Sequence, residues 1–156
     1  MATFRVNVKS SAGVWGVEGS ELGVSRICLP HEYATASRGT APEPVALCAH
    51  ELGQYFAAAR PSFTTTLAPV VATDFQRSVW RALQAIPYGT VRTYAELAQC
   101  AGHPRAARAV GNANHANPWP IVVPCHRVVA RQGLGGYGGG AMVKRFLLER
   151  EGFVYD

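Results

Sequence analysis

The tetrapeptide Pro124-Cys125-His126-Arg127 places a thiol beside an imidazole and a guanidinium. A thiol reacts as its thiolate, and a nearby imidazole can accept the thiol proton directly or through one water molecule. The pattern indicates a nucleophilic cysteine, with the Cys125 sulfur held deprotonated beside His126. The alternative is a buried, inert cysteine followed by a solvent-facing histidine. Adjacency leaves both interpretations open, because consecutive side chains often point in different directions.

The other cysteines give no sign of a second chemical site. Cys28, Cys48, Cys100 and Cys125 lie far apart and form no C-x-x-C pair, so we expect neither a disulfide framework nor a zinc site. Residues 133–140 are rich in glycine but lack the Lys-Ser/Thr of a P-loop and a G-x-G-x-x-G frame. We therefore expect no metal, no nucleotide and no other cofactor.

The first part of the chain alternates apolar and polar residues and turns often, which predicts a small antiparallel sheet. The expected strands are residues 4–8, 13–17 and 24–29. A polar loop over residues 31–42 should connect this sheet to the next element.

A helix is predicted over residues 43–59, because apolar side chains including Cys48 recur there every three or four positions. This spacing makes Cys48 a core thiol. Arg60-Pro61 should end the helix, and residues 61–72 should form an extended linker.

The second part of the chain is predicted to be mainly helical. Thr73 with Gln76, and Thr93 with Glu96, fit capping boxes that open two helices. A third helix is expected to start at Pro104 and run to about Ala113. The helices after Thr93 and after Pro104, joined by a turn that contains glycine, would form a helix-turn-helix. A final helix is expected over residues 142–151.

The positive charge lies almost entirely in this second part. The chain carries a net charge of +5; residues 1–72 are neutral, with five basic and five acidic side chains, and residues 73–156 carry ten basic and five acidic. Between Arg77 and Arg145 nine basic side chains stand against one acid, Glu96. A phosphate-binding surface needs such a field, although ordinary solubilising charge would look the same.

Together these patterns predict an α+β fold in two domains, residues 1–72 and residues 73–156. An apolar fraction of 48% is in the globular range. No apolar run is long enough to span a bilayer, and the N-terminal residues lack the apolar core of a signal peptide. We therefore expect no membrane partner and an intracellular, cytoplasmic location, with nucleoid association in a bacterial cell.

Six segments of the chain resemble the O6-alkylguanine-DNA alkyltransferases, also called methylated-DNA–protein-cysteine methyltransferases. The segments come in the family's order and at close to its spacing. The similarity runs over roughly residues 74–153. The matching segments are Thr93–Ala98, Arg105–Gly111, Asn117–Val129, Gly136–Gly140, Lys144 and Leu147–Gly152. The resemblance implies a helical C-terminal domain with a helix-turn-helix. In outline, it also implies an N-terminal α/β, ribonuclease-H-like domain. Some relatives bind zinc there, but Cys28 and Cys48 lack the matching histidines.

The resemblance assigns roles in the reaction. Cys125 would accept the alkyl group, His126 would take its proton through a bound water, and Glu151 would orient His126. Asn117 would bond the backbone near the cysteine turn. Tyr94 would meet guanine N3 and donate a proton. Taken singly, each has an ordinary structural interpretation: a surface glutamate, an Asn-Pro turn and a core tyrosine.

The resemblance also implies contacts to DNA. Arg108 would fill the gap left by an everted base, and its small neighbours would let the helix enter the minor groove. Tight packing within the protein would explain these small residues equally well. The implied DNA or base contacts are Arg108, Tyr94, Tyr137, Gly138, Ala106, Ala107, Gly111, Arg127, Val128 and Lys144. Gly138 departs from the family, since many members carry Ser or Arg there, and its lost side chain would widen the pocket or loosen the loop.

The implied activity is single-turnover DNA repair, in which the alkyl group of O6-alkylguanine in duplex DNA moves irreversibly to Cys125. O4-alkylthymine stays open as a second substrate. We expect a monomer, with cooperative binding on DNA left open. The alternatives are a lesion-binding relative without transfer, a plain helix-turn-helix regulator and a cysteine hydrolase. The first would lack Cys125, and the second would not need the Pro-Cys-His-Arg turn.

Overall fold

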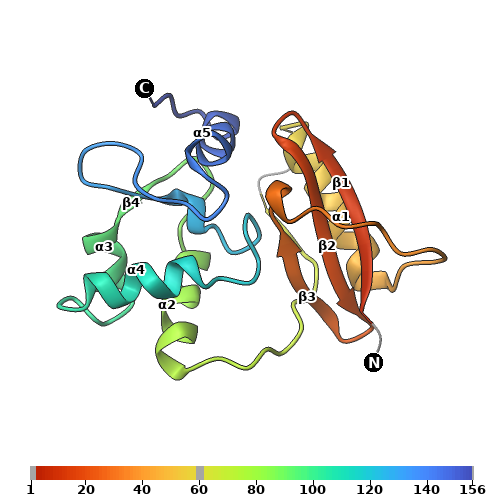
Figure 1. Cartoon of the computed structure of the whole chain (residues 1–156). Helices are drawn as coiled ribbons and strands as arrows, with labels where there is room; N and C mark the ends of the chain where they lie inside the picture. Colours follow the sequence, from red (N-terminus) through yellow and green to blue (C-terminus); the bar gives the residue numbers. More distant parts are fainter. Residues whose placement is uncertain (1–2, 59–61, 156) are drawn as a thin grey trace. The chain divides into compact units, whose positions relative to one another are not determined.

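The computed structural model describes residues 3–58 and 62–155. Its contacts divide the chain into two compact units, Met1–Val70 and Val71–Asp156, which are coloured red to yellow and yellow-green to blue in Figure 1. The described residues contain no helix that is both long and apolar enough to cross a membrane.

The first unit is a three-stranded antiparallel sheet covered on one face by a helix. Strands β1 (Phe4–Ser10), β2 (Gly13–Ser20) and β3 (Gly23–Cys28) pair in that order, as the alternating pattern predicted. Helix α1 (Glu43–Phe56) lies against this sheet (Figure 1). The α+β class predicted from the sequence is thus confirmed, and the Cys48 thiol is fully buried as expected.

Helix α1 ends three residues before the predicted Ala59. Ala57 caps the helix by donating to the Gly53 carbonyl, and Ala58 takes a positive φ of 61°. A left-handed residue just past the end is a common way to stop a helix. The stop signal predicted at Arg60-Pro61 lies outside the described residues.

The predicted linker is docked onto the first unit rather than free. Leu67 forms a parallel bridge with Val24. The buried Glu51 carboxylate accepts bonds from the backbone amides of Thr64 and Thr65 at 3.0 Å. Residues 62–72 contain no helix and a single bridge, which fits the predicted linker, but local spacing could not reveal its contacts because the partners lie far away in the sequence.

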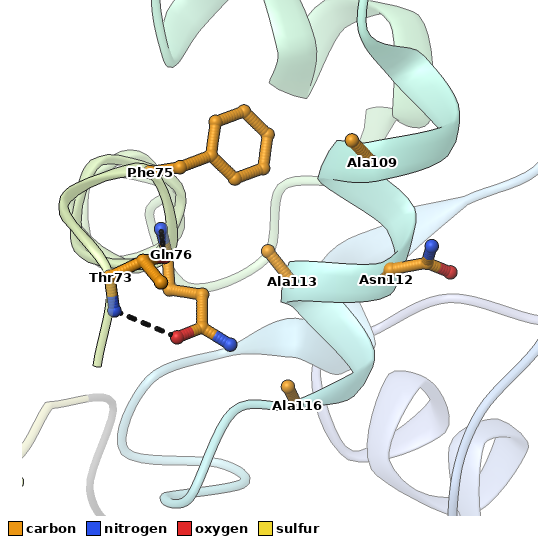
Figure 2. Close-up of a pocket in the computed structure, with 7 residues that line it drawn as sticks. All are labelled: Thr73, Phe75, Gln76, Ala109, Asn112, Ala113 and Ala116. Carbon is orange, nitrogen blue, oxygen red and sulfur yellow. Dashed lines mark hydrogen bonds between the residues drawn. The ribbon is translucent and has the colours of Figure 1, made fainter. Parts of the chain in front are cut away.

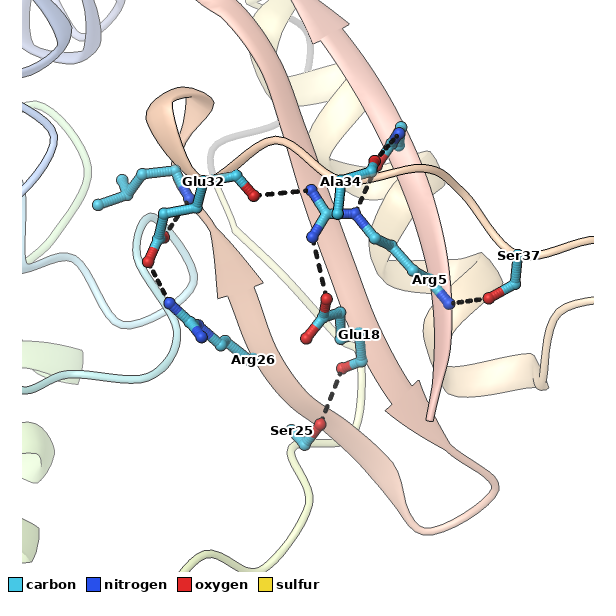
Figure 3. Close-up of polar contacts among 9 residues, drawn as sticks. Arg5, Glu18, Ser25, Arg26, Glu32, Ala34 and Ser37 are labelled. Carbon is cyan, nitrogen blue, oxygen red and sulfur yellow. Dashed lines mark hydrogen bonds and ion pairs between the residues drawn. The ribbon is translucent and has the colours of Figure 1, made fainter. Parts of the chain in front are cut away.

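Polar contacts tie the loop after β3 to the sheet (Figure 3). The Arg5 guanidinium is buried and pairs with Glu18 at 2.9 Å. The backbone amide of Arg5 donates to the Ser37 hydroxyl. Glu32 belongs to the short 3-10 turn η1 (Pro30–Glu32) and pairs with Arg26. The polar loop therefore has a fixed course where these side chains hold it.

The second unit contains the predicted helices α2 (Asp74–Gln84), α3 (Tyr94–Cys100), α4 (Ala107–His115) and α5 (Ala141–Arg150). Both predicted capping boxes are present: the Thr73 and Thr93 hydroxyls accept from the amides of Gln76 and Glu96. Helices α2, α3 and α4 pack against one another, and α3 is followed by α4 after a short turn (Figure 1).

Helix α4 begins at Ala107, three residues later than predicted. The Ala106 amide donates to the His103 carbonyl at 3.0 Å, which closes a turn around Pro104. Pro104 therefore belongs to the turn and not to the first helical position. The later start leaves Arg108 as the second residue of the helix.

Three further elements of the second unit were not predicted. Strand β4 (Arg92–Thr93) pairs in parallel with β5 (Val128–Val129), and Cys125–Arg127 forms the 3-10 turn η2. Two-residue strands are too short to leave a periodic signal. The pairing connects the start of α3 to the residues that follow the cysteine.

Candidate active site

The turn that carries Cys125 is held by Asn117. The Asn117 amide donates to the Val123 carbonyl at 2.7 Å, and its oxygen accepts from the Trp119 amide at 3.0 Å. Between them Ile121 has a positive φ of 75°, a conformation that branched residues rarely adopt. These bonds compensate for the strained backbone and fix the approach to Cys125.

The Cys125 thiol is buried, with 7% of the residue exposed. Burial raises its pKa above the ordinary value, against the lowering effects of a hydrogen bond from Asn117, the charge of Lys144 and a hydrogen bond from Tyr137. The raised pKa means that Cys125 is protonated at rest near neutral pH. This direction disfavours the deprotonated sulfur expected from the sequence, because burial outweighs the favourable contacts.

His126 is fully buried, and its Nε2 lies 2.6 Å from Glu151 Oε2. A carboxylate can only accept, so this contact assigns the ring proton to Nε2 and leaves Nδ1 as the basic atom. Burial lowers the pKa of His126, Glu151 raises it, and the charges of Arg127 and Lys144 lower it further. The resting ring is thus a neutral imidazole that can accept a proton.

Glu151 follows α5 directly and is buried rather than on the surface. Besides His126, its carboxylate accepts from the Gly89 amide at 3.2 Å and from the Arg127 Nε at 2.7 Å. Because three elements meet at this carboxylate, it couples the end of α5 to the turn that carries Cys125.

Arg127 and Val128 do not lie where DNA could reach them. The Arg127 guanidinium is 6% exposed and is bound to Glu151 and to the Ile86 carbonyl. Val128 is fully buried, and its carbonyl accepts from Lys144 at 2.6 Å. The predicted DNA contacts of both residues are corrected here. In the sequence, an inward Arg127 was indicated only by the apolar residues on both sides of the Pro-Cys-His-Arg turn.

Lys144 and Tyr94 meet at one carbonyl of the glycine-rich loop. Lys144 is completely buried, and its Nζ donates to Gly136 O at 3.0 Å; the Tyr94 hydroxyl lies 3.4 Å from the same oxygen. Burial lowers the pKa of Lys144 to about 8, against the raising effect of Cys125. Burial also raises the pKa of Tyr94, and the charge of Cys125 adds to it.

The glycine-rich loop passes close to this cluster. Gly135 has a φ of 77°, and a Cβ there would lie 2.9 Å from the Ala130 amide and 3.3 Å from the Tyr94 ring. Tyr137 is half-buried and bonds to Cys125, whereas Gly138 is exposed. The close approach of the loop to Tyr94 explains why glycine stands at position 135.

The residues predicted to contact DNA from α4 occupy one accessible end of that helix. Arg108 and Ala107 are exposed, and Ala106 and Gly111 are partly exposed. A Cβ on Gly111 would stand 3.8 Å from the Tyr94 ring. The small residue there lets the α4 backbone pass close to a side chain of the cysteine site.

A separate open groove of about 440 Å³ lies between the start of α2 and α4 (Figure 2). It contains none of the predicted site residues; its lining is Thr73, Phe75, Gln76, Ala109, Asn112, Ala113 and Ala116. The described residues contain no group of three or more metal-ligating side chains.

The fold and the turn at Cys125 define a class: an α+β protein in which a buried thiol is followed in the chain by a buried imidazole that is bonded to a glutamate. Comparison with known families agrees with this class. Residues 74–153 match the model described as 6-O-methylguanine DNA methyltransferase, DNA binding domain. The chain therefore belongs to this methyltransferase family.

Individual relatives support the assignment. A methylated-DNA–protein-cysteine methyltransferase of Methanosarcina acetivorans is 53% identical over 103 residues, 65% of this chain. The match spans 65% of that relative's length, just under two thirds.

Solved structures resemble the chain over nearly its whole length. The crystal structure of Mycobacterium tuberculosis O6-methylguanine methyltransferase has a TM-score of 0.83 and 38% identity, covering 96% of this chain and 93% of the other. Mycobacterium tuberculosis OGT in complex with DNA has a TM-score of 0.81 and 40% identity, covering 94% and 92%.

Proposed function

We propose that this protein repairs alkylated guanine in duplex DNA by moving the O6-alkyl group onto Cys125, once per molecule. The observation that carries the proposal is a buried thiol in a fixed turn, next in the chain to a buried imidazole whose Nε2 lies 2.6 Å from the Glu151 carboxylate; burial raises the pKa of the thiol and lowers the pKa of the ring. This arrangement can generate a thiolate at the moment of reaction without storing one at rest.

The reaction is a displacement at the alkyl carbon. His126 Nδ1 takes the Cys125 proton through a water molecule, and the sulfur then forms a bond to the carbon as the carbon–O6 bond breaks. Guanine leaves as its anion, and the Tyr94 hydroxyl donates a proton to N3 as the leaving group forms. Exchange with water then moves the purine proton to N1, and the proton taken up by His126 replaces the one that Tyr94 gave. A thioether remains on Cys125. It has no ready route back to the thiol, so one molecule acts once.

Several nearby groups favour charge separation during this step. Glu151 stabilises the imidazolium that forms on His126, while Lys144 and the Asn117 and Tyr137 side chains stabilise the developing thiolate. Since these groups are buried, their electrostatic effect is stronger than in water.

The substrate base must leave the DNA helix, because O6 of a stacked guanine is out of reach of a buried sulfur. We assign Arg108, on the exposed side of α4, to the gap that the base leaves behind. The α3–α4 pair acts as a helix-turn-helix whose second helix enters the minor groove. Ala106, Ala107 and Gly111 allow that close approach. Tyr137 and Gly138 then lie beside the everted base.

The proposed partner is double-stranded DNA, since the family model that matches this chain is a DNA-binding domain and a Mycobacterium tuberculosis relative was solved with DNA. A lesion-binding protein without transfer is the alternative. Cys125 disfavours it, because binding alone requires no thiol in this turn. We propose a monomer that needs no resident metal or nucleotide.

Mass measurement tests the proposal. After incubation with duplex DNA containing O6-methylguanine, the protein should gain the mass of one methyl group, located on Cys125 by peptide mapping. Cys125→Ala should gain none yet bind the same DNA, and Cys100→Ala, at an exposed cysteine, should behave as the wild type. A methyl group on another residue, or loss of binding in Cys125→Ala, would contradict the division of roles.

A further inference from the structure

Arg127 is the positive half of a buried ion pair that the mechanism above does not use. Its Nε lies 2.7 Å from Glu151 Oε1 and a terminal nitrogen lies 3.2 Å from Oε2. The other terminal nitrogen donates to the Ile86 carbonyl at 2.8 Å, and the guanidinium carbon stands 5.7 Å from the centre of the Tyr88 ring. Three hydrogen bonds and the Tyr88 ring therefore hold the Arg127 guanidinium in one orientation.

The same carboxylate serves both the arginine and the imidazole. Glu151 Oε2 is 2.6 Å from His126 Nε2 and 3.2 Å from Arg127. A carboxylate next to an imidazole favours the charged ring, whereas a carboxylate already neutralised by a guanidinium does so much less. The effect of Glu151 on His126 thus depends on whether Arg127 is present.

We propose that Arg127 is a positioning residue for alkyl transfer: by neutralising Glu151, it keeps His126 uncharged and ready to accept the Cys125 proton at physiological pH. The inference rests on the proposed function for its catalytic consequence, but its electrostatic part concerns His126 alone. It assigns to Arg127 an inward role in place of the DNA contact expected from the sequence.

The charges on His126 come from two elements in the described part of the chain. Arg127 belongs to its own turn, whereas Glu151 and Lys144 come from the end of α5 and from α5 itself. Arg127 and Glu151 cancel, and Lys144 adds a positive charge that further disfavours the protonated ring before the Cys125 proton arrives. Without Arg127, the unbalanced Glu151 would raise the pKa of His126 and hold the ring protonated before any thiol proton arrives.

The test is an NMR titration of His126, assigned by comparison with His126→Gln, alongside single-turnover rates between pH 6 and 9. Arg127→Gln should move the His126 titration to higher pH. Its transfer rate should fall about two- to fivefold at pH 6.5, as a titration midpoint about one pH unit higher requires when the wild-type midpoint lies below that pH, and approach the wild-type rate by pH 8.5. Arg127→Lys keeps the positive charge but loses the planar guanidinium, and His126 in this variant should titrate near its wild-type midpoint.

A double variant keeps the inference testable if Arg127→Gln fails to fold, as loss of one partner of a buried pair can cause. In Glu151→Gln, the unbalanced Arg127 should push the His126 titration to lower pH, and Arg127→Gln/Glu151→Gln should bring it back toward the wild type. An equal rate loss at every pH with an unmoved His126 titration, or identical titrations in Glu151→Gln and the double variant, would overturn the inference. Failure of the wild type to transfer any alkyl group would instead overturn the proposed function, whatever the titration shows.

Discussion

At the scale of single residues, the site surrounds a thiol and an imidazole whose pKa shifts both favour their uncharged forms at rest. Burial raises the pKa of Cys125 and lowers the pKa of His126, so both effects favour the uncharged thiol and the uncharged ring. A thiol in this state resists adventitious oxidation, because oxidants attack the thiolate. The charge separation is deferred until a substrate carbon is in place.

Lys144 is a buried cation that contacts the glycine-rich loop from within the site. Its pKa in the folded protein is lowered from 10.5 to about 8, so between these values the unfolded chain binds the extra proton. Stability attributable to Lys144 therefore rises with pH across this window, because the cost of burying the charge disappears. The full effect corresponds to about 3 kcal/mol.

Lys144→Met provides the measurement. The unfolding free energy of the wild type minus that of Lys144→Met, from urea titrations, should increase between pH 8 and pH 10.5. Lys9→Met, at an exposed lysine of β1 in the first unit, should give a flat difference over the same window. A flat difference for Lys144→Met too would mean that the pKa of Lys144 is the same in the folded and unfolded states, so that the buried lysine keeps its proton throughout the window.

The sequence predicted that Cys125 and His126 share a site with Asn117 and Glu151, but not how Arg127 and Lys144 lie around them. Adjacent Cys125 and His126, helped by the family resemblance, were enough to locate the site. The direction of Arg127 and the burial of Lys144 were not predictable, because each depends on partners that are distant in the chain, Glu151 for the first and Val128 and Gly136 for the second.

At the scale of elements, the glycine-rich loop must pass within contact distance of Tyr94. Gly135→Ala would place a methyl group 2.9 Å from the Ala130 amide at a positive φ. We expect a loss of about 1–3 kcal/mol in stability and a slower transfer, since the loop carries Tyr137. Gly136→Ala, where a Cβ meets nothing within 4 Å, is the matched control and should have little effect. Equal behaviour of both variants in urea unfolding would show that the loop is not constrained here.

We predict that helix α4 contributes to the transfer rate only when the substrate is duplex DNA. Arg108→Ala should slow repair of O6-methylguanine in duplex DNA much more than the reaction with free O6-benzylguanine, because the free base needs no eversion. Arg105→Ala, an exposed arginine outside the helix, should weaken DNA binding without this selectivity. Comparable rate losses of Arg108→Ala on both substrates would rule out a role in base flipping.

The elements show where sequence patterns are informative. Capping boxes fixed the starts of α2 and α3, because the signal and the bond lie within three residues. The start of α4 was misplaced since Pro104 suits a turn as well as a first helical position. The two-residue strands β4 and β5 were missed because their pairing is purely tertiary.

At the scale of the whole molecule, the positive charge belongs to the unit that carries the reactive thiol. Arg77, Arg81, Arg105, Arg108 and Arg131 are exposed there. If four or five of them neutralise phosphates, binding should weaken about a hundredfold or more between 50 and 200 mM salt. Fluorescence anisotropy with an unmodified duplex would measure this slope, and Arg131→Ala should reduce it. A salt-independent affinity would contradict an electrostatic DNA surface.

The most direct test of the account counts reaction events per molecule. A fixed amount of protein is mixed with increasing O6-methylguanine duplex, and restored guanine and S-methylated Cys125 are both quantified. The amounts of restored guanine and of S-methylated Cys125 should rise together and stop at one equivalent of protein. Restored guanine in excess of one equivalent, or restoration that leaves the Cys125 sulfur unmodified, would contradict it.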